Sequence, residues 1–150
     1  MIRRDYVERL IAQAAQALAQ VLDLVKAGQF DPALLLIRNT SDLVLGPLAR
    51  LVERLDAASA VELAGRYERD RIRLYAALVA EEGSIHELRG RESDAQRCYR
   101  RSLDLYAATA LAGTHLLPAD LERIAALLSK THELDGRSAE QLRRLLDSGH

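Results

Sequence analysis

The sequence predicts an all-α fold, and three observations lead to that prediction. The chain is rich in leucine and alanine, has only three prolines and lacks tryptophan, a composition that favours helix. Apolar residues recur at intervals of three or four, which is the helical period. Glycine, proline and capping residues divide the 150 residues into segments of helical length. We therefore expect about six or seven helices in one domain over residues 1–150, arranged as antiparallel hairpins in an irregular short solenoid or bundle.

The first helix is expected over residues 6–25, where two adjoining rows of apolar side chains make a wide buried face. Its polar face is narrow, so two neighbouring helices are needed to cover the rest. Gly28 is expected to end this helix in a left-handed conformation. Asp31 is expected to cap the second helix, and Pro32 to start its first turn.

The second helix carries four consecutive large aliphatic residues at positions 34–37. Successive helical residues point about 100° apart, so one partner cannot cover all four. This segment is therefore either central in the fold or in contact with another chain. Gly46 and Pro47 are expected to end the helix, and residues 48–55 to form a short amphipathic helix.

The middle of the chain contains two further predicted helices. Ser59 and Glu62 have the spacing of a capping box, and Gly65 is expected to stop the brief helix that they open. This piece and the one over residues 48–55 are interpreted as connectors between the main helices. A long helix follows over residues 68–89. Gly83 lies inside it and destabilises it by about 1 kcal/mol relative to alanine, which is usually accepted where another helix comes close. The polar residues expected to face water on the long helix are Arg69, Arg73, Glu81 and Glu87.

The C-terminal part contains three more predicted helices. Ser93 and Gln96 form a second capping box at the start of a helix over residues 94–111. The last two helices are expected over residues 118–130 and 138–146, the final one with a serine cap at its first residue. The stripe expected to face inward on the helix over residues 94–111 consists of Ala95, Cys98, Tyr99, Leu103, Tyr106 and Ala110.

One pattern of residues occurs twice in the chain. A shift of 62 residues superposes Gly28 on Gly90, Asp31 on Ser93, Ala33 on Ala95 and Ile37 on Tyr99. Such a turn needs a glycine to reverse the chain and a capping oxygen to restart it. A small alanine then lies where the two helices come closest, and a large apolar residue one turn later fills the gap. We therefore expect the same turn at both places.

The two segments "GQFDPALLLI" and "GRESDAQRCY" resemble the turn and second helix of tetratricopeptide repeats. Those repeats have 34 residues, whereas the offset here is 62 with helices inserted between, so the resemblance implies an irregular tetratricopeptide-like domain. Such domains bind peptides on the concave surface formed by the first helix of each pair. The matching positions here are Leu18, Leu22, Val25, Ala80, Ser84 and Glu87. The lysines and asparagines that clamp a C-terminal carboxylate in some of these domains are missing, which implies an apolar segment as the ligand, from a partner or from this chain's own C-terminal helices.

The segment "MIRRDYVERLIAQ", together with "GQFDPAL", resembles a family of small bacterial proteins that carry a domain of unknown function. That resemblance implies a helical fold and a bacterial source. It assigns no activity.

No residue pattern indicates catalysis. The chain has no glycine-rich phosphate loop, no GxSxG motif and no dinucleotide-binding motif. Cys98 lies on the predicted inward stripe, so we interpret it as a buried structural thiol and not as a nucleophile. Glu82 and His86 lie one helical turn apart and could give a metal two ligands, but no standard motif supplies a third, and His115 and His132 are in expected loops. We predict no catalytic, cofactor-binding or metal site, and an enzyme is the least favoured class.

Charge and hydropathy argue against nucleic acid and membranes as partners. The formal net charge is −1 and the pI is about 6.4, which gives no overall attraction to phosphate backbones or anionic lipid. Nine arginines lie between Arg66 and Arg101, but seven acids in the same stretch make a mixed surface that is mostly solvated. No apolar run approaches the ~20 residues that span a bilayer, and the start of the sequence does not resemble a signal peptide. We expect a cytoplasmic protein.

The surplus of apolar surface on the first two helices favours a function in protein–protein contact. We predict a non-enzymatic interaction module that self-associates, in the simplest case as a dimer. The candidate contact surface consists of Leu18, Leu22, Val25, Leu34, Leu35 and Leu36. The alternative is a small-ligand sensor, in which a crevice lined by Tyr75, Tyr99 and Arg97 binds an anionic or aromatic metabolite.

Overall fold

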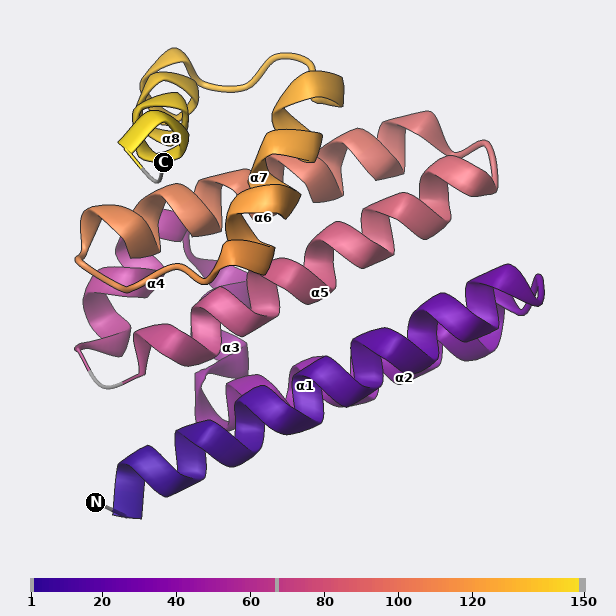
Figure 1. Ribbon diagram of the computed structural model, residues 1–150, viewed down its shortest axis with the longest axis horizontal. Helices are drawn as coiled ribbons and strands as arrows, with labels where there is room; N and C mark the ends of the chain where they lie inside the picture. The colour runs from indigo at the N-terminus through magenta and orange to yellow at the C-terminus, as the bar shows by residue number, and fades with distance from the viewer. Residues whose placement is uncertain (1, 67, 149–150) are drawn as a thin grey trace.

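The computed structural model describes residues 2–66 and 68–148, and all regular structure within them is helical (Figure 1). The predicted all-α fold is confirmed. The long helices are α1 (Ile2–Lys26), α2 (Phe30–Leu45), α5 (Arg69–Leu88), α6 (Glu92–Leu111), α7 (Pro118–Lys130) and α8 (Gly136–Ser148). Between α2 and α5 lie a short 3₁₀ helix, η1 (Gly46–Leu48), and the short helices α3 (Ala49–Arg54) and α4 (Ala57–Ala64).

Two antiparallel hairpins, α1–α2 and α5–α6, are closed by the same turn. Gly28 and Gly90 both have φ of +75°. The residues that follow them, Gln29 and Arg91, have backbone angles of −94°, 74° and −93°, 70°. In each turn the amide of that following residue donates to the carbonyl five residues earlier at 2.8 Å. The prediction of one turn used twice is therefore confirmed.

The two hairpins fill their equivalent central contacts with different pairs of side chains. In the first hairpin Val21 and Ile37 are both buried in the same apolar cluster. The positions 62 residues later are Gly83 and Tyr99. A Cβ atom added to Gly83 would lie 2.6 Å from Cε1 of Tyr99, so the aromatic ring occupies the space that a side chain would take. The predicted close approach of another helix at Gly83 is confirmed.

The α5–α6 hairpin lies at the centre of the fold. The α1–α2 hairpin packs against α5 on one side, while α4, α7 and α8 pack against α6 (Figure 1). One apolar cluster lies among α1, α2 and α5 and includes Leu10, Val21, Ile37, Leu78 and Ile85. A larger cluster lies around α5 and α6 and includes Ile72, Tyr99, Leu103, Tyr106 and Leu142.

The caps predicted after the two glycine turns are wrong. Helix α2 begins at Phe30, and Asp31 does not cap it but pairs at 2.9 Å with Arg89, the residue that follows α5. Helix α6 likewise begins at Glu92, one residue before the predicted cap Ser93. In each turn the residue after the glycine, Gln29 or Arg91, occupies the N-cap position. Its side chain makes no cap hydrogen bond to the helix.

The two remaining serine caps are also wrong, for a different reason. Asp56 precedes α4, and its carboxylate accepts the amide hydrogen of Ser59 at 2.7 Å. Asp135 accepts the amide hydrogen of Ser138 at 3.3 Å, and α8 begins at Gly136. In both places the serine is three residues inside the cap, and the aspartate before it supplies the acceptor.

Candidate functional site

The structure separates the six residues of the predicted contact surface into two groups. Leu22 of α1 and Leu35 of α2 are 49% and 58% exposed. The half-buried members, which pack at the edge of the α1–α2–α5 cluster, are Leu18, Val25, Leu34 and Leu36. Ile37, the last residue of the four-residue aliphatic run, is buried. The run is therefore central at Ile37 and solvent-facing at Leu35.

The outer side of the α1–α2 hairpin has no long helix packed on it in the described part of the chain. The main neighbour of both helices outside the hairpin is α5, and α2 also touches the short segments η1 and α3. Leu43 of α2 is 48% exposed in addition to the two residues above. We call Leu22, Leu35 and Leu43 the outer leucines.

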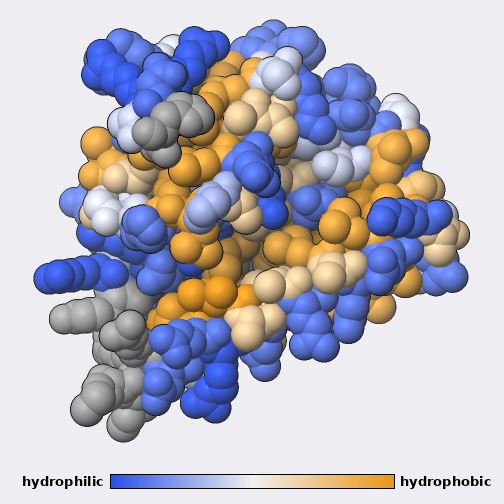
Figure 2. All heavy atoms as spheres, viewed as in Figure 1, coloured by the Kyte–Doolittle hydropathy of each residue, from blue (hydrophilic) through white to orange (hydrophobic). Residues whose placement is uncertain are grey.

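Figure 2 shows the face of the molecule on which α1, α5, α7 and α8 lie toward the viewer. Apolar side chains form patches over the middle of this face, with charged side chains between them. The tetratricopeptide resemblance implies three peptide-binding positions on α5, and these offer little apolar surface. Ala80 is buried, Ser84 donates to the Ala80 carbonyl at 3.3 Å and Glu87 is charged.

The residues of the predicted crevice do not line one cavity among the described residues. Tyr99 is fully buried, and its hydroxyl donates to Glu87 at 2.8 Å. Arg97 is exposed and pairs with Asp94 on its own helix. Tyr75 is half-buried and lines a pocket on the side of α5 that faces α2.

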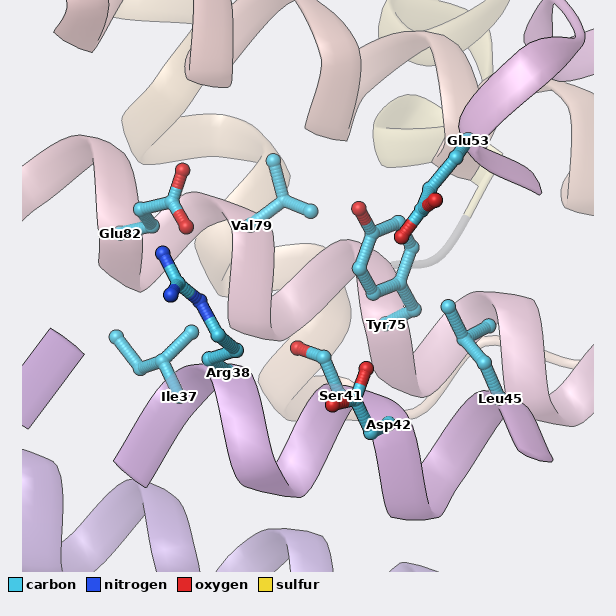
Figure 3. Close-up of a pocket in the computed structure, with 9 residues that line it drawn as sticks. All are labelled: Ile37, Arg38, Ser41, Asp42, Leu45, Glu53, Tyr75, Val79 and Glu82. Atoms are coloured by element: carbon cyan, nitrogen blue, oxygen red, sulfur yellow. The ribbon is translucent and has the colours of Figure 1, made fainter. Parts of the chain in front are cut away.

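The pocket beside Tyr75 lies between α2 and α5, with α3 contributing one residue (Figure 3). Its volume is about 170 Å³, below the roughly 300–1,000 Å³ of most small-molecule sites. Its charged lining consists of Arg38 and three carboxylates, Asp42, Glu53 and Glu82. Figure 3 shows Arg38 pointing toward Glu82. Burial raises the pKa of the Tyr75 hydroxyl. The acidic excess of the lining disfavours an anionic ligand, which is one of the two kinds, anionic or aromatic, in the sensor alternative.

A charged network is buried where α5, α6 and α7 meet. Arg73, which was predicted to face water, is only 3% exposed, and its Nη1 donates to Oδ2 of Asp120 at 2.8 Å. That prediction is wrong because α7 covers this side of α5. The hydroxyl of Tyr106 donates to Oδ1 of Asp120 at 3.0 Å, and the amide of Leu117 donates to Oδ2 at 2.9 Å. The sequence shows Asp120 only as an acid in the first turn of a helix.

Three other arginines of the dense segment bind main-chain carbonyls. Arg71 donates to the last carbonyls of α2, at 3.4 Å for Leu45. Arg69 donates at 3.0 Å to the carbonyl of Ala112, the residue that follows α6, and Arg101 donates to a carbonyl of α3. Guanidinium groups suit helix C-termini, where carbonyls lack partners and the helix dipole is negative. These arginines therefore join separate elements of the fold, and the prediction of a mostly solvated arginine surface is wrong for them.

Cys98 is buried, as its position on the inward stripe predicts. Burial raises the pKa of the thiol to about 12, and the neighbouring Glu82 carboxylate also raises it. A nucleophilic cysteine needs a lowered pKa, so this thiol stays protonated near neutral pH and is a poor nucleophile. The structure also brings Cys98 to the pair formed by Glu82 and His86. The close approach at Gly83 contains that signal, because a Cβ atom added to Gly83 would lie 3.0 Å from Cβ of Cys98.

No family model, curated protein or solved structure matches this chain. Within residues 2–66 and 68–148, no helix has the length and apolar character needed to cross a membrane. The function is therefore argued from the side chains described above.

Proposed function

We propose that this protein is a non-enzymatic interaction module whose α1–α2 hairpin binds another polypeptide, and that its first partner is a second copy of itself. The observation that carries the proposal is the exposure of the outer leucines, each about half accessible to water. The end units of stacked helical hairpins normally have a polar outer face. The shared turn of the two hairpins supports a tetratricopeptide-like arrangement, in which this hairpin is the end unit.

The size of the apolar surface indicates weak self-association. Full burial of a leucine side chain contributes about 1.5–3 kcal/mol, so half of one contributes roughly 1 kcal/mol. A two-fold interface uses the same patch on both chains, so the outer leucines would contribute roughly 6 kcal/mol in total. Association costs about 4–15 kcal/mol, and further edge contacts are therefore required. If those edge contacts offset the cost of association, the roughly 6 kcal/mol from the outer leucines corresponds to a dissociation constant of about tens of micromolar.

The test is the concentration dependence of the molar mass. Sedimentation velocity from about 5 to about 200 µM, which brackets the expected dissociation constant, should show a rise from monomer toward dimer. Leu35→Glu should abolish that rise, because an isologous interface would bring two carboxylates together. Leu111→Glu is the matched control, since Leu111 is 77% exposed and is the last residue of α6, outside the α1–α2 hairpin. A strict monomer over this range, or an equal effect of both variants, would contradict self-association through this hairpin.

A small-ligand sensor is the second candidate, supported by the pocket beside Tyr75. Its three carboxylates and single guanidinium favour a small cationic ligand over an anionic one. A thermal-shift screen with amines and with carboxylates distinguishes the two, because a ligand that binds only the folded state raises Tm. Shifts with neither class would remove the sensor hypothesis.

A further inference from the structure

Three side chains of different metal-binding chemistry meet where α5 packs against α6. Glu82 and His86 lie one turn apart on α5, and Cys98 approaches them from α6. The Sγ atom of Cys98 lies 3.2 Å from Oε2 of Glu82. The Nε2 atom of His86 lies 3.8 Å from the same oxygen. One ligand atom of each residue lies within 4.8 Å of the other two.

Hydrogen bonding within the fold does not account for the histidine in this cluster. The Nδ1 atom of His86 is buried and has no hydrogen-bond partner among the described residues. Leaving such a polar atom unpaired destabilises the fold. The other ring nitrogen faces the Glu82 carboxylate, which also accepts the thiol hydrogen of Cys98. The Glu82 carboxylate therefore lies against both of the other side chains.

We propose that Glu82, His86 and Cys98 together bind one zinc ion. Thiolate, imidazole and carboxylate are the ligands that zinc takes in proteins. In a tetrahedral site with bonds of about 2.0–2.3 Å, the ligand atoms lie about 3.3–3.6 Å apart. The separations here run from 3.2 Å to at most 4.8 Å. Closing the widest one by about 1.2–1.5 Å is within the reach of side-chain rotation.

Three protein ligands leave the fourth position of this zinc to water. The side chain of Glu82 is 43% exposed and that of His86 is 15% exposed, while Cys98 is buried. The ion therefore enters beside Glu82, and its open position faces solvent. Structural zinc sites are closed by four protein ligands, so we infer an exchangeable zinc that the helical fold does not require.

The binding step balances without an oxidant or reductant. A zinc–sulfur bond forms, and the thiol proton of Cys98 is released to solvent. His86 binds through a neutral nitrogen and Glu82 through its carboxylate. No electron is transferred. The site is independent of the outer leucines, because it lies on α5 and α6 and they lie on α1 and α2.

The test uses Co²⁺ as a spectroscopic substitute for zinc. The full 150-residue chain, without a tag and stripped with a chelator, is titrated with Co²⁺ and then with Zn²⁺. A cobalt–thiolate bond produces a charge-transfer band in the near ultraviolet, so we expect that band to saturate at one cobalt per chain. Zinc should then remove the band. Absence of the band at a tenfold excess of cobalt would overturn the proposal.

Variants assign the ligands. Cys98→Ser should abolish the band, and Glu82→Gln should weaken cobalt binding by at least about tenfold. His115→Ala is the control, because that exposed histidine lies outside the cluster and its loss should change nothing. Circular dichroism checks the fold of each variant. Glu82 is partly exposed, so Glu82→Gln should fold even if Cys98→Ser does not, and equal binding by Glu82→Gln and the parent chain would refute the site.

Discussion

Replacing Gly83 by alanine should destabilise the protein, although alanine is the better helix former. The added methyl group would lie 2.6 Å from Cε1 and 2.8 Å from Cδ1 of Tyr99. Carbon atoms in contact prefer about 3.5 Å or more, so the ring would have to retreat by about 0.9 Å. The ring has little freedom to retreat, because it is fully buried, its hydroxyl is bound to Glu87, and Nζ of Lys130 lies 4.6 Å from its centre.

The expected magnitude follows from two opposing contributions. Overpacking a buried contact costs about 1–3 kcal/mol, and the gain in helix propensity from glycine to alanine is about 1 kcal/mol. Because the ring is held on several sides, we place the overpacking in the upper part of its range. Gly83→Ala should therefore lower the free energy of unfolding by about 1–2 kcal/mol.

Urea denaturation followed by circular dichroism measures this change, with Gly136→Ala as the control. A Cβ atom on Gly136 would meet no atom within 4 Å, so that variant should change stability by no more than about 0.5 kcal/mol. In a Tyr99→Leu background, Gly83→Ala should instead stabilise the protein by about 1 kcal/mol, because the ring is gone and only the helix propensity remains. If Gly83→Ala had the same effect in both backgrounds, the ring would not occupy the space above Gly83.

Two further substitutions test the polar contacts of the fold. Asp120→Ala should cost about 3–5 kcal/mol in urea denaturation, because the buried Arg73 guanidinium loses its buried carboxylate and keeps only the more exposed Asp70 at 3.4 Å. A loss below about 1 kcal/mol, typical of surface pairs, would show that the pair with Asp120 is solvated. The second concerns Asp56, whose pKa is lowered by hydrogen bonds from Ser59, first from the amide and then from the hydroxyl. Because the folded-state pKa is the lower of the two, the ionised carboxylate stabilises the fold fully above the unfolded-state pKa of about 3.9. This stabilisation is lost as the pH falls through the folded-state pKa. The stability difference between the parent chain and Asp56→Ala should therefore be full at neutral pH and shrink in acid, and a pH-independent difference would count against the cap.

Local signals in the sequence predicted the helices and their breaks. Residues 118–130 form a helix within the predicted limits, and Gly65 stops α4 as expected. The repeated glycine turn was predictable because glycine is the residue that readily adopts the left-handed conformation of this turn. A small residue must also follow where the two helices come close. Cap positions were less predictable, because serine occurs both at the cap and three residues inside it. At Ser59 and Ser138 the preceding aspartate makes the difference.

The polar contacts between helices could not be predicted from periodicity. The long helix shows Arg73 at a position that can face water, and only the packing of α7, 47 residues later in the chain, buries it against Asp120. The cluster of Glu82, His86 and Cys98 is a partial exception. Its three ligands come from two helices, but the register set by Gly83 and Tyr99 brings Cys98 next to Glu82. A sequence search limited to ligands on one helix finds only the pair.

Buried polar contacts are concentrated around α5, α6 and α7, whereas the α1–α2 hairpin is held mainly by apolar contacts. Around α5, α6 and α7, a buried network headed by Asp120 fixes the packing through hydrogen bonds with defined partners. The α1–α2 hairpin is held to α5 mainly by apolar contacts, with Arg71 and Arg89 at its two ends. The network lies on other helices, so a partner on the outer side of this hairpin would not contact it. The outer leucines therefore lie apart from the buried network, whereas the proposed zinc ligands lie on α5 and α6, two of the helices that the network joins.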